Sequence, residues 1–546
     1  MFNHDLFQMA NDVLGSRRHF LKTAGLALGA GFIPTLAGYG SSGGSGRAGE
    51  LTGRPLTLQG VQFGDMLADR AVVWSRSDGP ARMVVEYGFK PDFSDAGTLP
   101  GPLALPGTDY TARLDLSGLP SGREVYVRVL FRDLDNPKIF SEPLYGRFRT
   151  APEDRRDVRF LWSGDTCGQG WGINPDIGGM RIFEAMRRTA PDFFIHCGDS
   201  IYADSPIPES QIVPQTGAVW NNLVIPEVAK VAETLDEFRG RYKYNLLDDN
   251  LRRFNAEVPT VWLWDDHEIT NNWSPSKDLG ADPRYAEKSI AKLVERGRRA
   301  AFEYAPMRLP SADAAGRIYR KLSYGPLLDV FALDMRSYRG GNNCNDQARP
   351  GPETCYLGRE QLDWLKAGLK RSAAVWKVIA ADMPLGLQSL DGVDGRSRPQ
   401  FESVANGDGP VRGREFELAE LLAFLKREGI ANTVWLTADV HYAAAHFYEP
   451  AKARFKDFEP FWEFVAGPLN AGSFGPHELD DTFGPQVIFQ KASPVSNLSP
   501  LLGLQSFGQV DVDGRSGVMT VVLKDGEGNA LYTGELVPAW RKRGPK

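Results

Sequence analysis

Four short segments of the sequence place carboxylates beside histidine, cysteine or tyrosine, each at the end of an apolar run. They are Gly164-Asp165-Thr166-Cys167, Gly198-Asp199-Ser200-Ile201-Tyr202, Asp265-Asp266-His267-Glu268 and Ala438-Asp439-Val440-His441. His4 and His19 lie near the N-terminus, and of the other histidines only His477 lies outside these segments and their flanks. Two cations that share a site need carboxylate and imidazole ligands from separate strands and one carboxylate that bridges them. The pattern therefore predicts a two-metal centre.

The elements that must position these segments read as alternating strands and helices. Apolar strands are predicted at 158–165, 191–199, 258–268, 327–336, 376–384 and 431–441, and helices at 178–190, 235–254, 358–372 and 414–429. Strands that are apolar on both faces and alternate with helices indicate an α/β domain. In such a domain the ligand site gathers at the carboxyl ends of the strands. The acids and histidines of the four segments are expected there.

The first part of the chain has a different rhythm. Residues 52–150 read as short strands separated by turns, which predicts a β-sandwich. Trp74 and Tyr126 resemble the core tryptophan and the tyrosine corner of fibronectin type III-like domains, although any all-β domain can bury such residues.

A chain of 546 residues exceeds what one hydrophobic core usually serves, so two domains are expected. The net charge of −6 provides no basic face for a phosphate backbone, and we expect no nucleic-acid partner.

The four segments resemble the binuclear metallophosphoesterase pattern D-x-H, G-D-x-x-D/Y, G-N-H-E and G-H-x-H, in the variant of the PhoD-like alkaline phosphatases. The block "WDDHEITNN" at 264–272 is close to that family's own form, and "LDMRSYR" at 333–339 is similar to its later strand. The resemblance runs from about residue 50 to the C-terminus and is looser after about 450. It implies an α/β fold with a metallophosphoesterase-type β-sandwich flanked by helices, after a small all-β domain. The expected boundaries are 1–46 for a leader and linker, 52–150 for the β-sandwich and 155–546 for the catalytic domain.

The resemblance also implies a ligand set for two cations. The first would be held by Asp165, Cys167, Asp199, Tyr202 and His441, with Asp199 bridging; the second would be held by Asp266 and Asp439, with Asn271 or Asn272 nearby. A phenolate with a thiolate favours ferric iron, and oxygen ligands suit calcium or another divalent ion. The family implies iron with calcium, and the ligand types permit this without requiring it. Cys167 stands where the pattern has histidine, so an inert turn cysteine is the alternative, as is a loop-packing tyrosine for Tyr202.

The expected chemistry is attack of a metal-bound water on phosphorus. His267 would give a proton to the leaving group or hydrogen-bond the phosphate. Arg336 would clamp two phosphate oxygens, with a structural ion pair to Asp334 or Glu268 as the alternative. His196 and His446 would orient ligands.

These residues predict a phosphomonoesterase and phosphodiesterase that releases phosphate from mono- or diesters. A phospholipase D-like diesterase is the nearest alternative, and the loops at 203–235 and 385–415 would decide the substrate. An inactive extracytoplasmic binding or adhesion protein is an alternative of another class. The complete set of acids argues against it, because buried carboxylates are costly without cations.

The N-terminus predicts export. "SRRHFLK" at 16–22, followed by an apolar stretch, resembles a twin-arginine leader, in which Arg17 and Arg18 would be read by the twin-arginine machinery. An amphipathic helix with a chance arginine pair is the alternative. The apolar run is too short and Gly-rich for a membrane span, so a periplasmic or secreted protein is expected. In an oxidising compartment Cys344 and Cys355 could form a disulfide or remain free.

Overall fold

A computed structural model describes residues 53–309, 316–407 and 409–539. The predicted leader, with Arg17 and Arg18, lies outside these residues. Gln211–Trp220 belongs to a compact unit separate from the one that contains Pro55–Ser210 and the chain from Asn221 onward. All of the predicted site residues lie in that second unit. Among the described residues, no helix combines the length and the apolar character that crossing a membrane requires.

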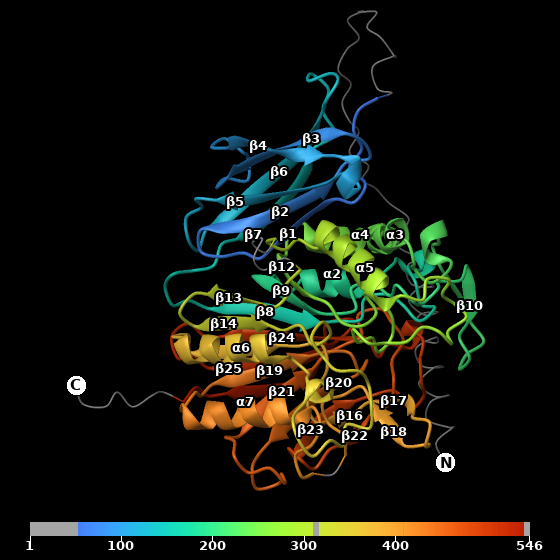
Figure 1. Ribbon diagram of the computed structural model, residues 1–546. Helices are drawn as coiled ribbons and strands as arrows, with labels where there is room; N and C mark the ends of the chain where they lie inside the picture. Colours follow the sequence, from blue (N-terminus) through green and yellow to red (C-terminus); the bar gives the residue numbers. More distant parts are fainter. Residues whose placement is uncertain (1–52, 310–315, 408, 540–546) are drawn as a thin grey trace, which may run out of the picture. The chain divides into compact units, whose positions relative to one another are not determined.

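Two large sheets carry the four ligand segments (Figure 1). The first has the order β26 (Ala530–Leu536), β25 (Met519–Asp525), β24 (Ser506–Val512), β8 (Val158–Ser163), β9 (Phe193–Cys197), β12 (Thr260–Leu263), β1 (Val61–Gly64), β2 (Arg70–Arg76), β5 (Thr111–Ser117). The second has the order β13 (Arg320–Tyr324), β14 (Leu328–Ala332), β15 (Trp376–Ala380), β19 (Thr433–Thr437), β21 (Phe461–Val465), β20 (Ala443–Tyr448), β23 (Pro485–Lys491). The central strands β8, β9 and β12 run parallel, as do β14, β15, β19 and β21. Their carboxyl ends therefore gather at one edge of each sheet.

The inner faces of the two sheets share one hydrophobic core. Phe160 and Ile195 of the first sheet cluster with Val378 and Leu436 of the second, all less than 1% exposed. Trp162 joins the layers directly, because its indole N–H donates to Thr437 O at 3.2 Å. The central strands β9, β12 and β14 are buried on both faces, which explains the uninterrupted apolar runs in the sequence.

Helices cover the outer faces. Those on the first sheet are α2 (Ile182–Arg187), α3 (Leu235–Asn245), α4 (Asp249–Asn255) and α5 (Ile290–Tyr304), and those on the second are α6 (Arg359–Arg371) and α7 (Glu415–Arg427). The helical spacing of Leu362, Leu365 and Leu369 brings all three onto the second sheet. The predicted helices at 358–372 and 414–429 are confirmed, and the one at 178–190 is shorter in the structure. The segment 235–254, predicted as one helix, forms the two helices α3 and α4, and α5 was not predicted. The α/β fold with a flanked β-sandwich is therefore as expected.

The N-terminal part forms a sandwich that shares strands with the first large sheet. One layer has the order β4 (Gly97–Ala104), β3 (Ala81–Gly88), β6 (Glu124–Asp133), β7 (Leu144–Arg149). The other layer is β1, β2 and β5, and β1 pairs with β12 at Gly64 and Thr260. On β2 the side chains alternate, so Val73 faces the sandwich and Trp74 faces away from it. Trp74 packs on α5, where its indole N–H donates to Glu303 O at 2.7 Å, so it is not the sandwich core residue that the sequence suggested.

Candidate metal centre

The metal-type side chains sit in tight turns directly after the parallel strands. Asp165 follows β8, Asp199 follows β9 and Asp439 follows β19, with φ angles of 61°, 53° and 65°. His441 has a φ of 59°. The left-handed region costs a residue other than glycine about 1 kcal/mol, and such strain persists where the surroundings enforce it. Four ligand-type residues in strained backbone conformations at one edge indicate a site where the fold enforces the positions of the ligand atoms.

The structure brings these residues together in three overlapping groups. In each group, potential ligand atoms lie within 4.8 Å of one another; the groups are Asp165 with Asp199 and His441, Asp199 with Asp266 and His267, and Asp265 with Asp266 and Asp439. Asp199 belongs to the first two groups, which is the position that the predicted bridging role requires. Asp266 belongs to the last two.

The first group has the donors that a cation needs. Asp165 is 1% exposed, and neither of its carboxylate oxygens has a hydrogen-bond partner among the described residues. Burial raises its pKa well above the usual range, a shift that Asp266 reinforces and His267 opposes. A buried carboxylate without partners is costly, and a cation removes that cost. The two free oxygens are therefore the observation that best fits a metal at this position.

His441 presents a neutral nitrogen to the same group. Its Nδ1 lies 2.5 Å from Gly472 O, so Nδ1 carries the hydrogen and donates it to that carbonyl. Nε2 then faces Asp165 at 3.7 Å and accepts from the Tyr202 hydroxyl at 2.9 Å. Burial lowers the pKa of His441 to about 4. This arrangement orients an imidazole for metal binding, and it brings Tyr202 to the group as the sequence predicted.

His267 is held by a carboxylate that the sequence analysis did not single out. Its Nδ1 donates to Asp204 Oδ1 at 2.6 Å, and Asp204 Oδ2 accepts from the main-chain N–H of Asn271 at 2.8 Å. Burial alone would lower the pKa of His267, but Asp204, Asp266 and Asp199 outweigh it and hold the pKa well above its usual value. These carboxylates therefore favour the protonated imidazole. Asp204 lies five residues after Asp199, so the segment "GDSIYAD" contains a signal that could have identified it.

Glu268 ties the turns of the centre to one another. Its carboxylate accepts from the main-chain N–H groups of Asp199 (3.1 Å), Ser200 (2.6 Å) and Asp265 (2.7 Å) and from the Ser200 hydroxyl (2.6 Å). It is fully buried. The glutamate of "DDHE" therefore fixes the turn after β9 against the turn after β12.

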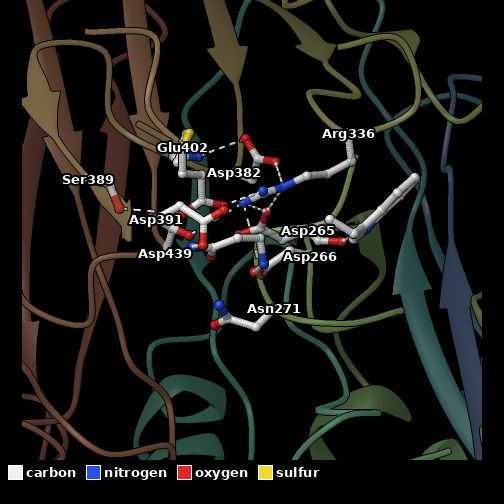
Figure 2. A network of polar contacts seen from close by, with 12 residues as sticks. Asp265, Asp266, Asn271, Arg336, Asp382, Ser389, Asp391, Glu402 and Asp439 are labelled. Atoms are coloured by element: carbon white, nitrogen blue, oxygen red, sulfur yellow. Dashed lines mark hydrogen bonds and ion pairs between the residues drawn. The ribbon is translucent and has the colours of Figure 1, made fainter. Parts of the chain in front are cut away.

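Arg336 lies in the middle of an acidic network (Figure 2). The guanidinium is fully buried and pairs with Asp265 at 2.6 Å, with Asp382 at 3.4 Å and with Glu402. Asp439 and Asp266 lie 3.7 and 3.9 Å from it. This geometry favours a structural ion pair over the predicted phosphate clamp, although the partners are not Asp334 or Glu268. Asp382 ends a strand and could have been suspected, whereas Glu402 lies in a loop without any motif.

Cys167 is not part of the three groups. Its thiol donates to Trp171 O at 3.4 Å and packs among apolar residues that include Leu161 and Ile173. Burial, with the charge of Asp248, raises the pKa of this thiol well above its usual value. The geometry therefore favours the inert turn cysteine over the predicted ligand.

Three other predicted residues have peripheral places. The side chain of Asn271 is exposed, and Asn272 instead donates its main-chain N–H to Asp266. His196 lies beside the centre, with Nε2 2.6 Å from the Thr166 hydroxyl. His446 lies on β20 and pairs with Glu463 at 3.2 Å, so it orients no residue of the three groups.

Cys344 and Cys355 are free thiols.

Comparisons with known proteins agree with this geometry. The family model for the PhoD-like phosphatase matches residues 160–523, and that for the PhoD-like phosphatase N-terminal domain matches 44–152. The chain belongs to the PhoD-like phosphatase family. Alkaline phosphatase D of Bacillus subtilis (strain 168) is 26% identical over 491 residues, which cover 85% of this chain and 78% of that protein.

Two solved structures share the fold of this PhoD-like phosphatase. The structure of PhoD has a TM-score of 0.66 and 21% identity, over 91% of this chain and 95% of that one. A purple acid phosphatase, PPD1 from yellow lupin, has a TM-score of 0.53 and 13% identity, over 88% and 74% of the two chains. Together with the family membership, the clustered acids and histidines identify the chain as a metal-dependent phosphoester hydrolase with a metallophosphoesterase-like α/β fold.

Proposed function

We propose that this PhoD-like phosphatase is an exported enzyme that hydrolyses phosphate mono- and diesters with two cations sharing Asp199. The observation that carries the proposal is the overlap of the three ligand groups at Asp199 and Asp266, next to the two unpartnered oxygens of Asp165. Two cations would lower the pKa of a bound water, so that attack by hydroxide becomes possible near neutral pH, and would neutralise the phosphoryl oxygens.

The residues of the chain divide between two cations. Asp165, Asp199, Tyr202 and His441 would hold the first, for which we propose ferric iron, because a phenolate is a ligand that a trivalent ion stabilises. Burial and the nearby Asp199 and Asp165 raise the pKa of the Tyr202 phenol, so it ionises only beside a highly charged cation. Asp199, Asp266 and Asp439 would hold the second, whose carboxylate donors suit calcium or another divalent ion.

His267 can supply the proton that the leaving group needs. Nδ1 is committed to Asp204, which leaves Nε2 to donate a proton, and the ring shares a ligand group with Asp199 and Asp266. Asp204 keeps the ring protonated and fixes its orientation, the two conditions that general acid catalysis requires. The His267 ring also packs on the Tyr202 ring, with centroids 4.3 Å apart, and this contact restrains the imidazole further.

Elemental analysis of the native protein, combined with assays on a panel of mono-, di- and triesters, tests this function. We expect two bound cations per chain, one of them iron, and turnover of para-nitrophenyl phosphate and its diester. Ferric phenolate absorbs visible light, so the protein should be coloured and should lose its colour in Tyr202→Phe. A colourless, iron-free enzyme with full activity would refute the iron assignment but not the hydrolase.

Export rests on the sequence of the leader. We expect replacement of both Arg17 and Arg18 by lysine to leave the protein in the cytoplasm, because the twin-arginine machinery reads the arginine pair. Cell fractionation with an immunoblot measures this. Unchanged export of the double variant would show that another route is used.

A further inference from the structure

The hairpin of β17 (Leu390–Val393) and β18 (Pro399–Phe401) belongs to the loop between β15 and α7, outside the four ligand segments. Its base is anchored by Glu402, whose main-chain N–H donates to Ser389 O at 2.9 Å and whose carboxylate pairs with Arg336. Figure 2 shows Ser389, Asp391 and Glu402 on the same side of the centre as Asp439. The hairpin is therefore connected to the acids of the second cation.

Asp391 hydrogen-bonds two asparagine side chains of other segments. Its Oδ1 accepts from the side-chain amide of Asn272 at 2.9 Å, and its Oδ2 accepts from that of Asn342 at 2.8 Å. The Asn342 amide also donates to Asn272 O at 3.1 Å, and Asn342 Oδ1 accepts from Arg339 at 3.0 Å. One half-buried carboxylate thus joins three separate segments of the chain.

Asn272 links the hydrogen bonds of Asp391 to the metal centre. Its main-chain N–H donates to Asp266 Oδ2, and its φ of 53° lies in the left-handed region. Asparagine adopts this region more readily than most residues other than glycine, and local hydrogen bonds stabilise it there. The side-chain bond to Asp391 and the carbonyl bond from Asn342 provide this stabilisation. Loss of Asp391 would let Asn272 relax and would release one oxygen of Asp266.

We propose that Asp391 is a positioning residue of the second cation site: through Asn272 it fixes the Asp266 carboxylate and couples the β17–β18 hairpin to cation binding. The inference rests on the proposed two-cation function. Asp391 belongs to none of the three ligand groups found among the described residues, so it acts through Asn272 rather than as a ligand.

The test compares cation affinity and turnover in Asp391→Asn, in which one of the two amide donors loses its acceptor. Titration calorimetry of the cation-stripped protein with calcium should show the second site weakened by about tenfold, the size typical for partners of metal ligands. Activity on para-nitrophenyl phosphate should recover at saturating calcium, so that kcat changes less than the calcium requirement. Asn272→Gly keeps the charge and permits the left-handed φ, and it should weaken the site similarly.

A rescue and a control complete the design. Asp391→Asn combined with Asn342→Asp exchanges carboxylate and amide. It restores the contact between positions 391 and 342 but loses the bond to Asn272 O, so it should restore the affinity only in part. Asp394→Asn removes a charge from the same hairpin, where Asp394 accepts from the N–H groups of Arg396 (2.8 Å) and Arg398 (2.9 Å), and should leave the affinity unchanged.

Three results would overturn the inference: wild-type affinity in Asp391→Asn, an equal loss in Asp394→Asn, or complete loss of one cation from Asp391→Asn, which would make Asp391 a ligand. Failure of the proposed function would appear in the wild-type protein, as the absence of cation binding or of ester hydrolysis.

Discussion

Among the described residues, no lysine or arginine pairs with the buried carboxylates around Asp165 and His441, whereas around Arg336 a guanidinium lies among acids from separate segments. Both regions are at the same edge of the two sheets and both are buried. The difference shows how a protein can hold many carboxylates in one place. The Arg336 region carries its own counter-charge, and the Asp165 region requires one from outside.

The largest expected effect comes from the acid that links the groups. Asp199→Ala removes a carboxylate shared by two ligand groups, so both cations should be lost and turnover should fall by more than about a hundredfold. Elemental analysis and an assay with para-nitrophenyl phosphate measure this. Retention of near-normal turnover would show that Asp199 does not bridge.

Arg336 should matter for folding more than for chemistry. Arg336→Met leaves Asp265, Asp382 and Glu402 without their counter-charge, and breaking a buried pair costs about 3–5 kcal/mol of unfolding free energy. Chemical denaturation measures the loss. Arg336→Lys keeps the charge and should lose less.

Ester kinetics distinguish this role from the phosphate clamp. A clamp predicts normal stability and a raised KM in Arg336→Lys. That result would restore the original interpretation of Arg336.

The third comparison concerns proton transfer. His267→Ala should lower turnover by about 10²–10⁴-fold on esters with poor leaving groups and by less on those with good ones, because only the former need a proton. Asp204→Asn should show the same dependence on the leaving group with a smaller loss of turnover, since the imidazole remains but its protonated form loses the carboxylate that stabilises it. Equal losses on both kinds of ester would argue against proton donation.

The sequence predicted the parts of this centre that follow strands. Asp165, Asp199, Asp266, Asp439 and His441 end apolar runs, and parallel strands in a sheet bring such ends together. The same reasoning located the helices α6 and α7 and the α/β fold.

Side-chain direction was not predictable in this way. Cys167 and Asp165 share one turn, yet only Asp165 joins the ligand groups. Arg336 looked like a free cation because its partners Asp382 and Glu402 are distant in sequence and Glu402 lies in a loop. Trp74 was placed in the wrong core because periodicity gives the alternation of a strand but not which element covers each face.

Glu415 and Asp480 show a third way to compensate buried carboxylate charge, which is to keep the carboxyls protonated. Both are at most 2% exposed, and one oxygen of each has no hydrogen-bond partner among the described residues. Burial, with the charge of Asp480, raises the pKa of Glu415 to about 8, and burial raises that of Asp480 to about 7. No lysine or arginine of the described part of the chain forms an ion pair with either carboxyl, and neither belongs to a ligand group, so a proton is the available counter-charge.

This pair predicts the smallest effect, a pH dependence of stability. In the unfolded chain Glu415 ionises near pH 4.3, so the folded state binds the proton more tightly and loses stability as pH rises from there to about 8. Glu415→Gln cannot ionise, and its Tm should exceed that of the wild type by about 3 °C at pH 9 but by little at pH 4. Calorimetry at both pH values measures the difference. A constant difference between pH 4 and pH 9 would mean that Glu415 is ionised in the folded protein, and that a cation rather than a proton compensates this pair.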